Sequence, residues 1–337
     1  MESAAKDAIF WMGGRLASEL SEISHNPLSL DRDGFWAVQI DYEGLWTLAK
    51  FDKVVTAEFA QSDWRPIAAP WSSSHSREEY IDYVSEIRRA IADGTVYQVN
   101  ACRVLSAPCN QSLNGLFSRI LIENPAPYSS YFKAGGVEIA SASPELFLKI
   151  SSDGTATSVK SSPIKGTSKI PEFGEKDQSE NVMIVDLIRN DLSRICEDGT
   201  IDVSRLLGVE KHPGLYHLVS DVVGKLRTDF SWSEFAKAML PAGSISGAPK
   251  SSAVKVISTH EELRGPYCGV IGWIERTNGV VSGVLSVGIR LFWRSEGEIH
   301  FGTGAGITWG SDPVAEWEET ELKANRLIAI ASGKDVS

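Results

Sequence analysis

Strand-like and helix-like segments follow one another along this 337-residue chain without a regular alternation. Short strand-like runs fill the start of the chain, as at 34–40 and 44–49. Others occur at 269–274 and 280–292, around the hairpin-type turn Thr277-Asn278-Gly279. Repeated βαβ units would require helices and strands in strict alternation. The order of the segments therefore predicts an α+β fold.

A connector rich in proline and serine, Pro66 to Ser76, marks the expected boundary between two regions. Residues 1–75 are expected to supply N-terminal strands and the connector, packed on a main catalytic region of residues 76–330. Ser76 and Glu79 form a capping-box pattern at the start of this second region, which predicts a helix that begins there.

The other predicted elements lie in the main region, where apolar periodicity and breaker residues define them. The predicted helices are 175–196, 232–240, 249–260 and a last helix that begins at Asp312-Pro313. The predicted strands are 96–105 and 137–150. Ser143-Pro144-Glu145 interrupts the second of these strands, and a proline at that point indicates a bulge or a sheet edge.

Charge and hydropathy exclude several classes of protein. The net charge is −11 and there is no basic tract, so nucleic-acid binding, which needs clustered lysine and arginine, is not expected. No apolar stretch is long enough to span a membrane, and the N-terminus lacks the pattern of a signal peptide. The four cysteines have no metal-type or redox-type spacing. We expect a cytoplasmic protein with free thiols that binds neither nucleic acid nor a membrane.

The segment from Ser162 to Thr167 brackets one lysine, Lys165, between Pro163 and Gly166. Proline fixes its own φ and favours an extended residue before it, while glycine allows close approach of a ligand. Such a segment can hold one amine in a defined place. Taken alone, these six residues are more typical of a surface turn with a solvated lysine.

Acidic residues of the last helix form a second candidate feature. Glu316, Glu319 and Lys323 are spaced so that they share one helix face. This face is either solvated, with an ion pair between Glu319 and Lys323, or it offers carboxylates to a hard cation. Glu180, on the helix predicted at 175–196, lies opposite the apolar stripe of that helix and is by itself an ordinary exposed glutamate.

Glycines and a histidine form weaker signals. Gly302, Gly304 and Gly306 alternate, which places bare backbone where a ligand could approach, but they do not open a dinucleotide-binding helix. The stretch from Ala242 to Lys250 lacks the spacing of a phosphate-binding loop. His217 lies among apolar residues and is more typical of a core histidine than of a catalyst.

Taken in order, these segments resemble the chorismate-utilising enzyme family from about Arg77 to Leu327. The matching stretches are Tyr97-Gln98-Val99-Asn100, Ser143-Pro144-Glu145, Pro163-Ile164-Lys165-Gly166-Thr167, residues 180–191, His217-Leu218-Val219-Ser220, residues 243–250, Gly304-Ala305-Gly306-Ile307 and Glu319-Thr320 with Lys323. The resemblance implies a two-sheet antiparallel β sandwich with helices packed outside and the site in the cleft between its halves.

Two positions divide the reactions within this family. Isochorismate-forming members carry a lysine where this chain has Gln98, and anthranilate synthases carry an alanine where it has Lys165. This pair therefore resembles the branch that aminates chorismate at C4 to give 4-amino-4-deoxychorismate, the precursor of 4-aminobenzoate and folate. Ala242, where the family commonly has glycine, is one of several departures.

The resemblance also implies roles for single residues. Lys165 is expected to form a covalent adduct at C2, and Glu145 to protonate the leaving C4 hydroxyl. Glu180 and Glu319 resemble the Mg²⁺ ligands, with Glu316 as a partner that either supports these ligands or reaches the metal through water. The other implied residues lie around the substrate: His217 and Ser244 at the ring and its pyruvyl side chain, Gln98 at C2, and Tyr267, Arg290, Gly304, Ala305, Gly306 and Lys323 at the two carboxylates.

The implied partners are chorismate and a source of ammonia. No cysteine lies in the Gly-x-Cys-x-Gly pattern of a glutamine amidotransferase, so ammonia is expected from a separate amidotransferase subunit. Two alternatives remain: an anthranilate synthase component I, which aminates C2 and eliminates pyruvate, and a non-catalytic subunit that binds chorismate.

Overall fold

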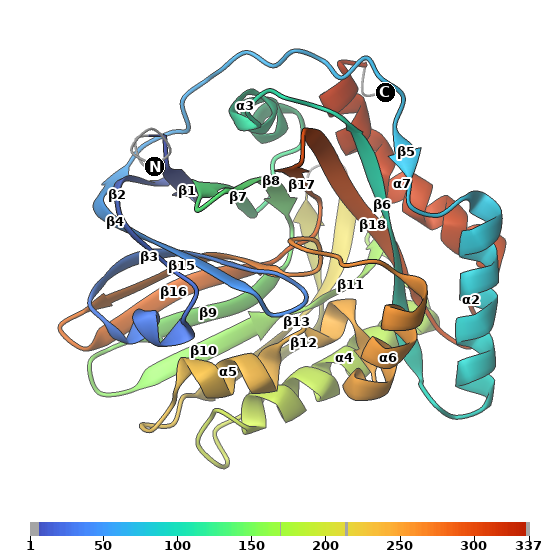
Figure 1. Cartoon of the computed structure of the whole chain (residues 1–337). Coiled ribbons are helices and arrows are strands. Elements are labelled where there is room, and N and C mark those ends of the chain that lie inside the picture. Colours follow the sequence, from blue (N-terminus) through green and yellow to red (C-terminus); the bar gives the residue numbers. More distant parts are fainter. Residues whose placement is uncertain (1–6, 169, 213–214, 335–337) are drawn as a thin grey trace.

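The computed structural model describes residues 7–168, 170–212 and 215–334. Strands in these residues pair antiparallel and form one large sheet, and helices pack against the outside of that sheet (Figure 1). The expected mixture of antiparallel strands and irregularly placed helices is therefore confirmed.

The first half of the sheet is built around the long pair β6 and β18. The hydrogen-bonded order, starting from the edge, is β5 (Ser72–Ser73), β6 (Gln98–Pro108), β18 (Glu298–Ile307), β17 (Leu291–Ser295), β8 (Val137–Ser143), β7 (Tyr128–Ala134) and β1 (Ile9–Met12). A short strand, β14 (Gly247–Ala248), also pairs with the start of β6.

The second half continues from β1 without a break. Its order is β2 (Arg15–Ser24), β4 (Trp46–Thr56), β3 (Gly34–Ile40), β15 (Val270–Thr277), β16 (Val280–Val287), β9 (Leu146–Ser152), β10 (Thr157–Ser162), β13 (Leu215–Lys225) and β12 (Asp202–His212). Next to β10, β11 (Ile164–Ser168) pairs with the same edge of β13.

The sheet folds back on itself, so that one face of each half packs against the other. Phe10, Phe132 and Leu291 from the first half lie in one buried cluster with Phe35 and Ile271 from the second half. Hydrogen bonding nevertheless runs through both halves by way of β1, which pairs with β7 and with β2. The expected division into two separate sheets is therefore not confirmed, because the strands are connected as one sheet.

Two bent chain segments also link the halves. The chain passes from β8 to β9 through Ser143-Pro144-Glu145, and from β16 to β17 through residues 288–290. The bends are tied together, because the Ser143 hydroxyl donates to the Val287 carbonyl at 2.7 Å and the Ala142 N–H donates to the Arg290 carbonyl at 2.9 Å. The interruption predicted at Pro144 is thus the point where a strand leaves one half for the other, and it positions Glu145 and Arg290.

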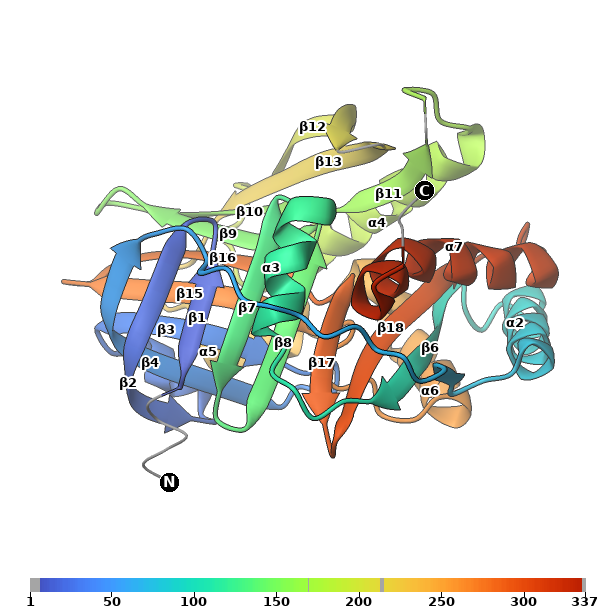
Figure 2. The ribbon, with the colours of Figure 1, turned by 90° about the horizontal axis from the view of Figure 1, so that it is seen from above.

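The helices cover the outer surfaces (Figures 1 and 2). Helices α4 and α6 contact β13 and β6, while α2, α3 and α7 lie on the side of the first half. Their bounds are α2 (Arg77–Ala92), α3 (Asn114–Glu123), α4 (Glu175–Ser193), α5 (Trp232–Met239), α6 (Lys250–His260) and α7 (Pro313–Ser332), with 3-10 helices η1 (Pro27–Asp31) and η2 (Gly243–Ile245).

Local signals in the sequence set several of these boundaries. The capping box at Ser76 is formed, with both reciprocal hydrogen bonds to Glu79 present. Asp312 accepts from the N–H groups of Val314 and Ala315 at the start of α7. The hairpin between β15 and β16 turns at Asn278 and Gly279, which both have positive φ. Helix α4 ends three residues before its predicted end at Cys196, because Cys196 forms a β-bridge with Leu226.

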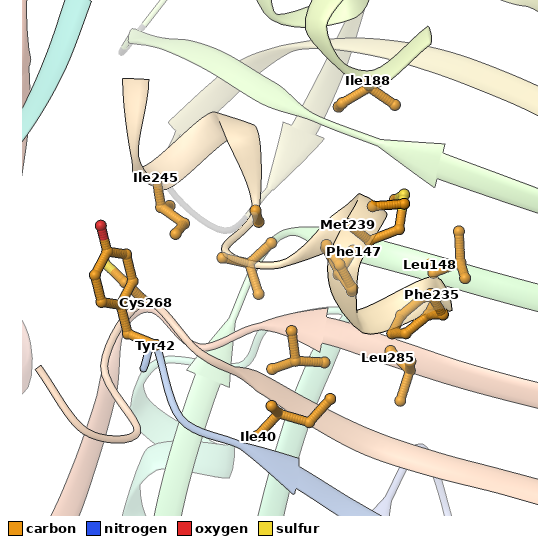
Figure 3. Packing of buried hydrophobic residues seen from close by; sticks show 14 of the residues in the cluster. Ile40, Tyr42, Phe147, Leu148, Ile188, Phe235, Met239, Ile245, Cys268 and Leu285 are labelled. Carbon is orange, nitrogen blue, oxygen red and sulfur yellow. The ribbon is translucent and has the colours of Figure 1, made fainter. Parts of the chain in front are cut away.

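The largest buried cluster reaches from α2, β6 and β18 in the first half to the second half of the sheet and helices α4 and α5. Phe147 and Leu148 of β9 pack there with Ile188 of α4, and Phe235 and Met239 of α5 (Figure 3). Burial of aliphatic and aromatic side chains stabilises such an interface by roughly 25 cal/mol per Å² of apolar surface removed from water. This core anchors α4 and the segments around Glu145.

The first 75 residues contribute strands to the same sheet as the rest of the chain. Strand β1 pairs with β7, and β3 pairs with β15 along its whole length. Among the described residues, no helix combines the length and the apolar character needed to cross a membrane.

Candidate functional site

Lys165 lies on a β-strand and not in a surface turn. Strand β11 pairs with β13, and the register shifts between Lys165 and Thr167, where Gly166 adopts a φ of +79°. A Cβ at Gly166 would lie 2.8 Å from Phe173 Cδ1, so both the positive φ and the lack of space favour glycine here. The interpretation as a solvated turn, which the six residues alone favoured, is wrong because β13 extends the sheet alongside them.

The Lys165 amine points to the 3-10 helix η2. Its Nζ donates to the Ser244 carbonyl at 3.0 Å. Burial lowers the pKa of Lys165 from its ordinary value, while the carboxylates of Glu145 and Glu180 oppose that shift. Desolvation disfavours the ammonium form, so the amine becomes more available as a nucleophile.

Glu145 follows the bend between β8 and β9 and is 4% exposed. Burial raises its pKa to about 7, against opposing contributions from the Lys165 ammonium and from hydrogen bonds with the Ser244 side chain and the Ile164 N–H. A carboxyl group with this pKa is substantially protonated near neutral pH. It can therefore deliver a proton, which is the role that the resemblance implied.

Gln98 faces the glycine-rich end of β18. A Cβ at Gly306 would lie 2.6 Å from Gln98 Nε2 and 3.9 Å from Lys165 Nζ, so bare backbone is required there. In the described part of the chain, Gln98 Oε1 is buried and has no hydrogen-bond partner. A buried acceptor without a donor costs stability, and it indicates a place where a ligand could donate.

The groups predicted to bind carboxylates meet where α7 packs on β18. Lys323 Nζ donates to the Gly304 carbonyl at 3.0 Å, and the Arg290 guanidinium donates to the Lys323 carbonyl. Arg290 has a positive φ of 56° at the second bend, and burial lowers its pKa. The structure thus brings Arg290, Gly304 and Lys323 together.

Three of the predicted substrate-binding residues are buried in the protein: Tyr267, Ala305 and His217. The Tyr267 ring lies against Gly302, where a Cβ would come within 2.0 Å of its Cγ, and its hydroxyl lies 3.9 Å from Cys102 Sγ. Ala305 is fully buried in β18, and His217 is 6% exposed on β13 opposite Thr167. Their predicted contacts with a substrate remain predictions.

Three glutamates from two helices form an acidic cluster. Glu180 of α4 lies with Glu316 and Glu319 of α7, and the charges of the two α7 residues help to raise the pKa of Glu180 after burial, the largest cause. Lys176 Nζ is 3.9 Å from Glu180 Oε1 and 3.6 Å from Glu316 Oε1. Glu316 is 4% exposed, whereas Glu319 on the same face of α7 is half-exposed and forms the expected ion pair with Lys323, so this face is only partly solvated.

This cluster fits a hard cation in its donor chemistry. Its donors are carboxylate oxygens, which suit Mg²⁺, and among the described residues Glu180 Oε1 is buried without a hydrogen-bond partner. The side chains are not arranged as a finished metal centre, since no group of three or more metal-ligating side chains is assembled in the described ranges. The assignment of Glu180, Glu319 and Glu316 to Mg²⁺ remains a prediction.

Lys176 and the Ile164 N–H were not identified from the sequence. Lys176 precedes Glu180 by one helical turn, so its spacing was visible, but an i, i+4 pair is usually a solvated surface pair. Its contact with Glu316 depends on the packing of α4 beside α7 and has no local signal. The Ile164 N–H could not be identified from the sequence, because every residue other than proline has a backbone N–H and only the fold places this one beside Glu145.

Comparison with known proteins groups this chain with one family. Residues 39–329 match the family described as chorismate binding enzyme. An aminodeoxychorismate synthase from Streptomyces pristinaespiralis is 36% identical over 269 residues, which cover 76% of this chain and 37% of that protein. An aminodeoxychorismate synthase component 1 from Klebsiella aerogenes is 30% identical over 317 residues, covering 87% and 68% of the two chains.

Anthranilate synthases match at similar identity. An anthranilate synthase component 1 from Haloarcula marismortui is 34% identical over 274 residues, covering 77% of this chain and 55% of that protein. The chain thus spans between 37% and 68% of the length of these three relatives. Among solved structures, the fold resembles a Bacillus anthracis protein described as a putative 2,3-dihydroxybenzoate-specific isochorismate synthase, with a TM-score of 0.79, 20% identity and coverage of 99% and 100%.

Proposed function

Because this chain belongs to the family of chorismate binding enzymes, we propose that it aminates chorismate at C4 with ammonia to form 4-amino-4-deoxychorismate. The observation that carries this proposal is the pairing of Lys165 with Glu145. A partly buried amine of lowered pKa lies near a buried carboxyl whose pKa is about 7. Such a pair offers a nucleophile and a proton donor to one ring.

The proposed reaction begins with attack of neutral Lys165 at C2. The two ring double bonds shift, the C4–O bond breaks, and the proton of Glu145 leaves with the hydroxyl as water. Hydroxide is a poor leaving group, so this proton transfer lowers the barrier. Ammonia then attacks C4, the double bonds shift back, and the Lys165 amine leaves C2. Gln98 supports this reaction over water addition at C2, because an amide cannot serve as the base for water.

Substrate binding in this proposal relies on positive charge around a dicarboxylate. Arg290 can bind a carboxylate with two parallel hydrogen bonds, and Lys323 lies one turn from Glu319. Glu180 and Glu319 would hold Mg²⁺, with Glu316 beside them. When bound, Mg²⁺ supplies positive charge that neutralises a substrate carboxylate.

The carboxylate cluster leads to a prediction on metal affinity. Replacing Glu180 or Glu319 with glutamine removes a charge but keeps the size, so Mg²⁺ affinity measured by calorimetry should fall by at least about tenfold. The free energy of unfolding should change little, because Glu319 is half-exposed and its ion pair with Lys323 contributes at most about 1 kcal/mol. Glu318→Gln on the exposed side of α7 is the matched control. Unchanged affinity in both variants would place the metal elsewhere.

The source of nitrogen leads to a second prediction. Incubated with chorismate, Mg²⁺ and ammonium, the chain should form 4-amino-4-deoxychorismate, identified by mass spectrometry and by conversion to 4-aminobenzoate with a separate lyase. Glutamine in place of ammonium should give product only when a glutamine amidotransferase subunit is added, since the chain has no Gly-x-Cys-x-Gly pattern. The relative named component 1 supports such a division of labour. Glutamine turnover by the pure chain would contradict this prediction.

Anthranilate formation is the second candidate, because relatives with that name match at similar identity. The same incubation separates the two, since anthranilate is aromatic and fluorescent whereas 4-amino-4-deoxychorismate is not aromatic. A fluorescent product in the absence of the lyase would favour anthranilate synthesis. Binding of chorismate without any product would favour a non-catalytic subunit.

A further inference from the structure

A small cavity lies directly behind Glu145 and Ser244. Its volume is about 10 Å³, which is room for one molecule of the size of water. The polar part of its wall consists of Glu145, Ser161, Asp191 and Ser244. Phe147, Ile188 and Met239, labelled in Figure 3, belong to its apolar part. The cavity therefore shares two walls with the candidate site and is closed on the other side by the core.

The polar wall offers more acceptors than donors. Asp191 is 4% exposed, and its Oδ2 accepts from Lys250 Nζ at 2.7 Å. Lys250 Nζ also donates to the Ala238 carbonyl at 3.2 Å, so two of its three protons already have acceptors. Once Glu145 has given its proton to the departing water, its carboxylate oxygens accept only, as do those of Asp191, and the serine hydroxyls can do either. A small guest with many donors suits this wall best.

Ammonia matches the cavity better than water does. The two molecules are similar in size, but ammonia has three N–H donors and one lone pair, whereas water has two of each. Lys250 also offsets the negative charge of Asp191, so the Asp191 carboxylate does not need a cation beside it and a neutral molecule can occupy the cavity. We propose that this cavity holds the ammonia molecule that attacks C4, an inference that rests on the amination proposed above.

The position of the cavity agrees with the order of bond changes. In the proposed reaction Glu145 protonates the oxygen on C4, so C4 must lie within reach of Glu145. Ammonia in the cavity lies next to the same carboxyl group. As its nitrogen bonds to C4, the Glu145 carboxylate takes one proton from that nitrogen and Lys165 leaves C2 with its electron pair. Glu145 thereby regains the proton that it gave to the departing water.

Ser161 is the wall residue best suited to a test, because it is 3% exposed on β10 and has no assigned role in binding chorismate. Ser161→Val fills the cavity and removes an acceptor. We expect the KM for ammonium to rise by about tenfold or more, as for the loss of one or two hydrogen bonds. The KM for chorismate and the yield of the Lys165 adduct without ammonia should stay within about twofold of the wild-type values, because no contact with chorismate is changed. Ser158→Val, on the exposed face of β10, is the matched control.

Two further variants keep the test decisive if Ser161→Val fails to fold. Ser161→Ala removes the hydroxyl without adding bulk and should raise the KM for ammonium in the same direction. Met239→Ala enlarges the cavity and should allow methylamine to act as nucleophile, giving an N-methylated product that the wild type does not form.

The outcomes separate this inference from the proposed function. An unchanged KM for ammonium in both Ser161 variants would show that the cavity holds a structural water only. An equal rise in both KM values would assign the cavity to chorismate binding, and would also overturn the inference. If the wild type forms no C4-aminated product, the proposed function fails and the ammonia site fails with it.

Discussion

Replacing Lys165 with alanine is expected to abolish the covalent adduct and the C4 amination that depends on it. Wild-type enzyme treated with chorismate in the absence of ammonia and then denatured should carry added mass on the peptide that contains Lys165. The alanine variant should lack this mass while still binding chorismate, because Arg290 and Lys323 lie on other elements and remain. Peptide mass spectrometry and a chorismate binding isotherm measure the two results.

The Lys165→Ala variant should also change the product. With C2 no longer occupied by the lysine, ammonia can attack there directly, and the product should shift toward C2 amination of the anthranilate type. Lys165→Arg should not restore the wild-type reaction, since a guanidinium stays protonated and cannot attack. Lys149→Ala, an exposed lysine of β9, is the matched control. Synthesis of 4-amino-4-deoxychorismate by Lys165→Ala at the wild-type rate would show that Lys165 only positions charge.

Replacing Glu145 with glutamine should lower kcat by about 10²- to 10⁴-fold, the usual contribution of a positioned acid. The pH profile gives a sharper test. Glu145 acts in its protonated form, so activity should fall as the pH rises through about 7. Lys165 acts as a neutral amine, so its contribution rises with pH. The two limbs should form a bell that belongs to the interacting pair, and its falling limb should be absent from the residual activity of Glu145→Gln.

The free energy of unfolding should also depend on pH through Glu145. The folded pKa of Glu145 is about 7, above its ordinary value of 4.5, so the folded protein holds this proton at a pH where the unfolded chain has lost it. Its stabilising contribution is full below pH 4.5 and is lost as the pH rises through about 7. Above that pH the buried carboxylate costs about 3 kcal/mol.

Glutamine stays neutral at every pH, so Glu145→Gln should unfold at a higher denaturant concentration than the wild type, and by a larger margin at about pH 8 than at about pH 5.5. Glu172→Gln, which lies exposed after β11, should leave both the activity and this margin unchanged. A Glu145→Gln variant with the same pH profile as the wild type would show that another group supplies the proton.

The parts of the fold that depend on neighbouring residues were predictable from the sequence. The capping box of Ser76 and Glu79 forms as its pattern predicts, because both hydrogen bonds lie within one helical turn. The cap at Asp312 and the turn at Asn278-Gly279 are equally local. Pro144 marked an interruption of a strand, but only the structure shows that the chain crosses there from one half of the sheet to the other.

The pairing of distant strands was not predictable in the same way. Residues 162–168 look like a turn because proline and glycine flank the lysine, and they become a strand because β13, about fifty residues later, offers its edge. Likewise, the connection of both halves through β1 depends on a strand from the very start of the chain. Contacts of this kind are absent from any short window of sequence.

The sequence by itself determined which chemical groups this protein carries: one lysine between a proline and a glycine, a glutamate after Ser143-Pro144, and the glutamates of two helices. Only the tertiary structure decided their protonation and their neighbours. Lys165 donates to the Ser244 carbonyl, 79 residues away in the sequence. Glu145 is shielded from water by burial and is hydrogen-bonded by residues of β11 and η2. The pKa of an acid or an amine depends on the solvent and the charges around it. Those surroundings exist only after distant segments have packed together.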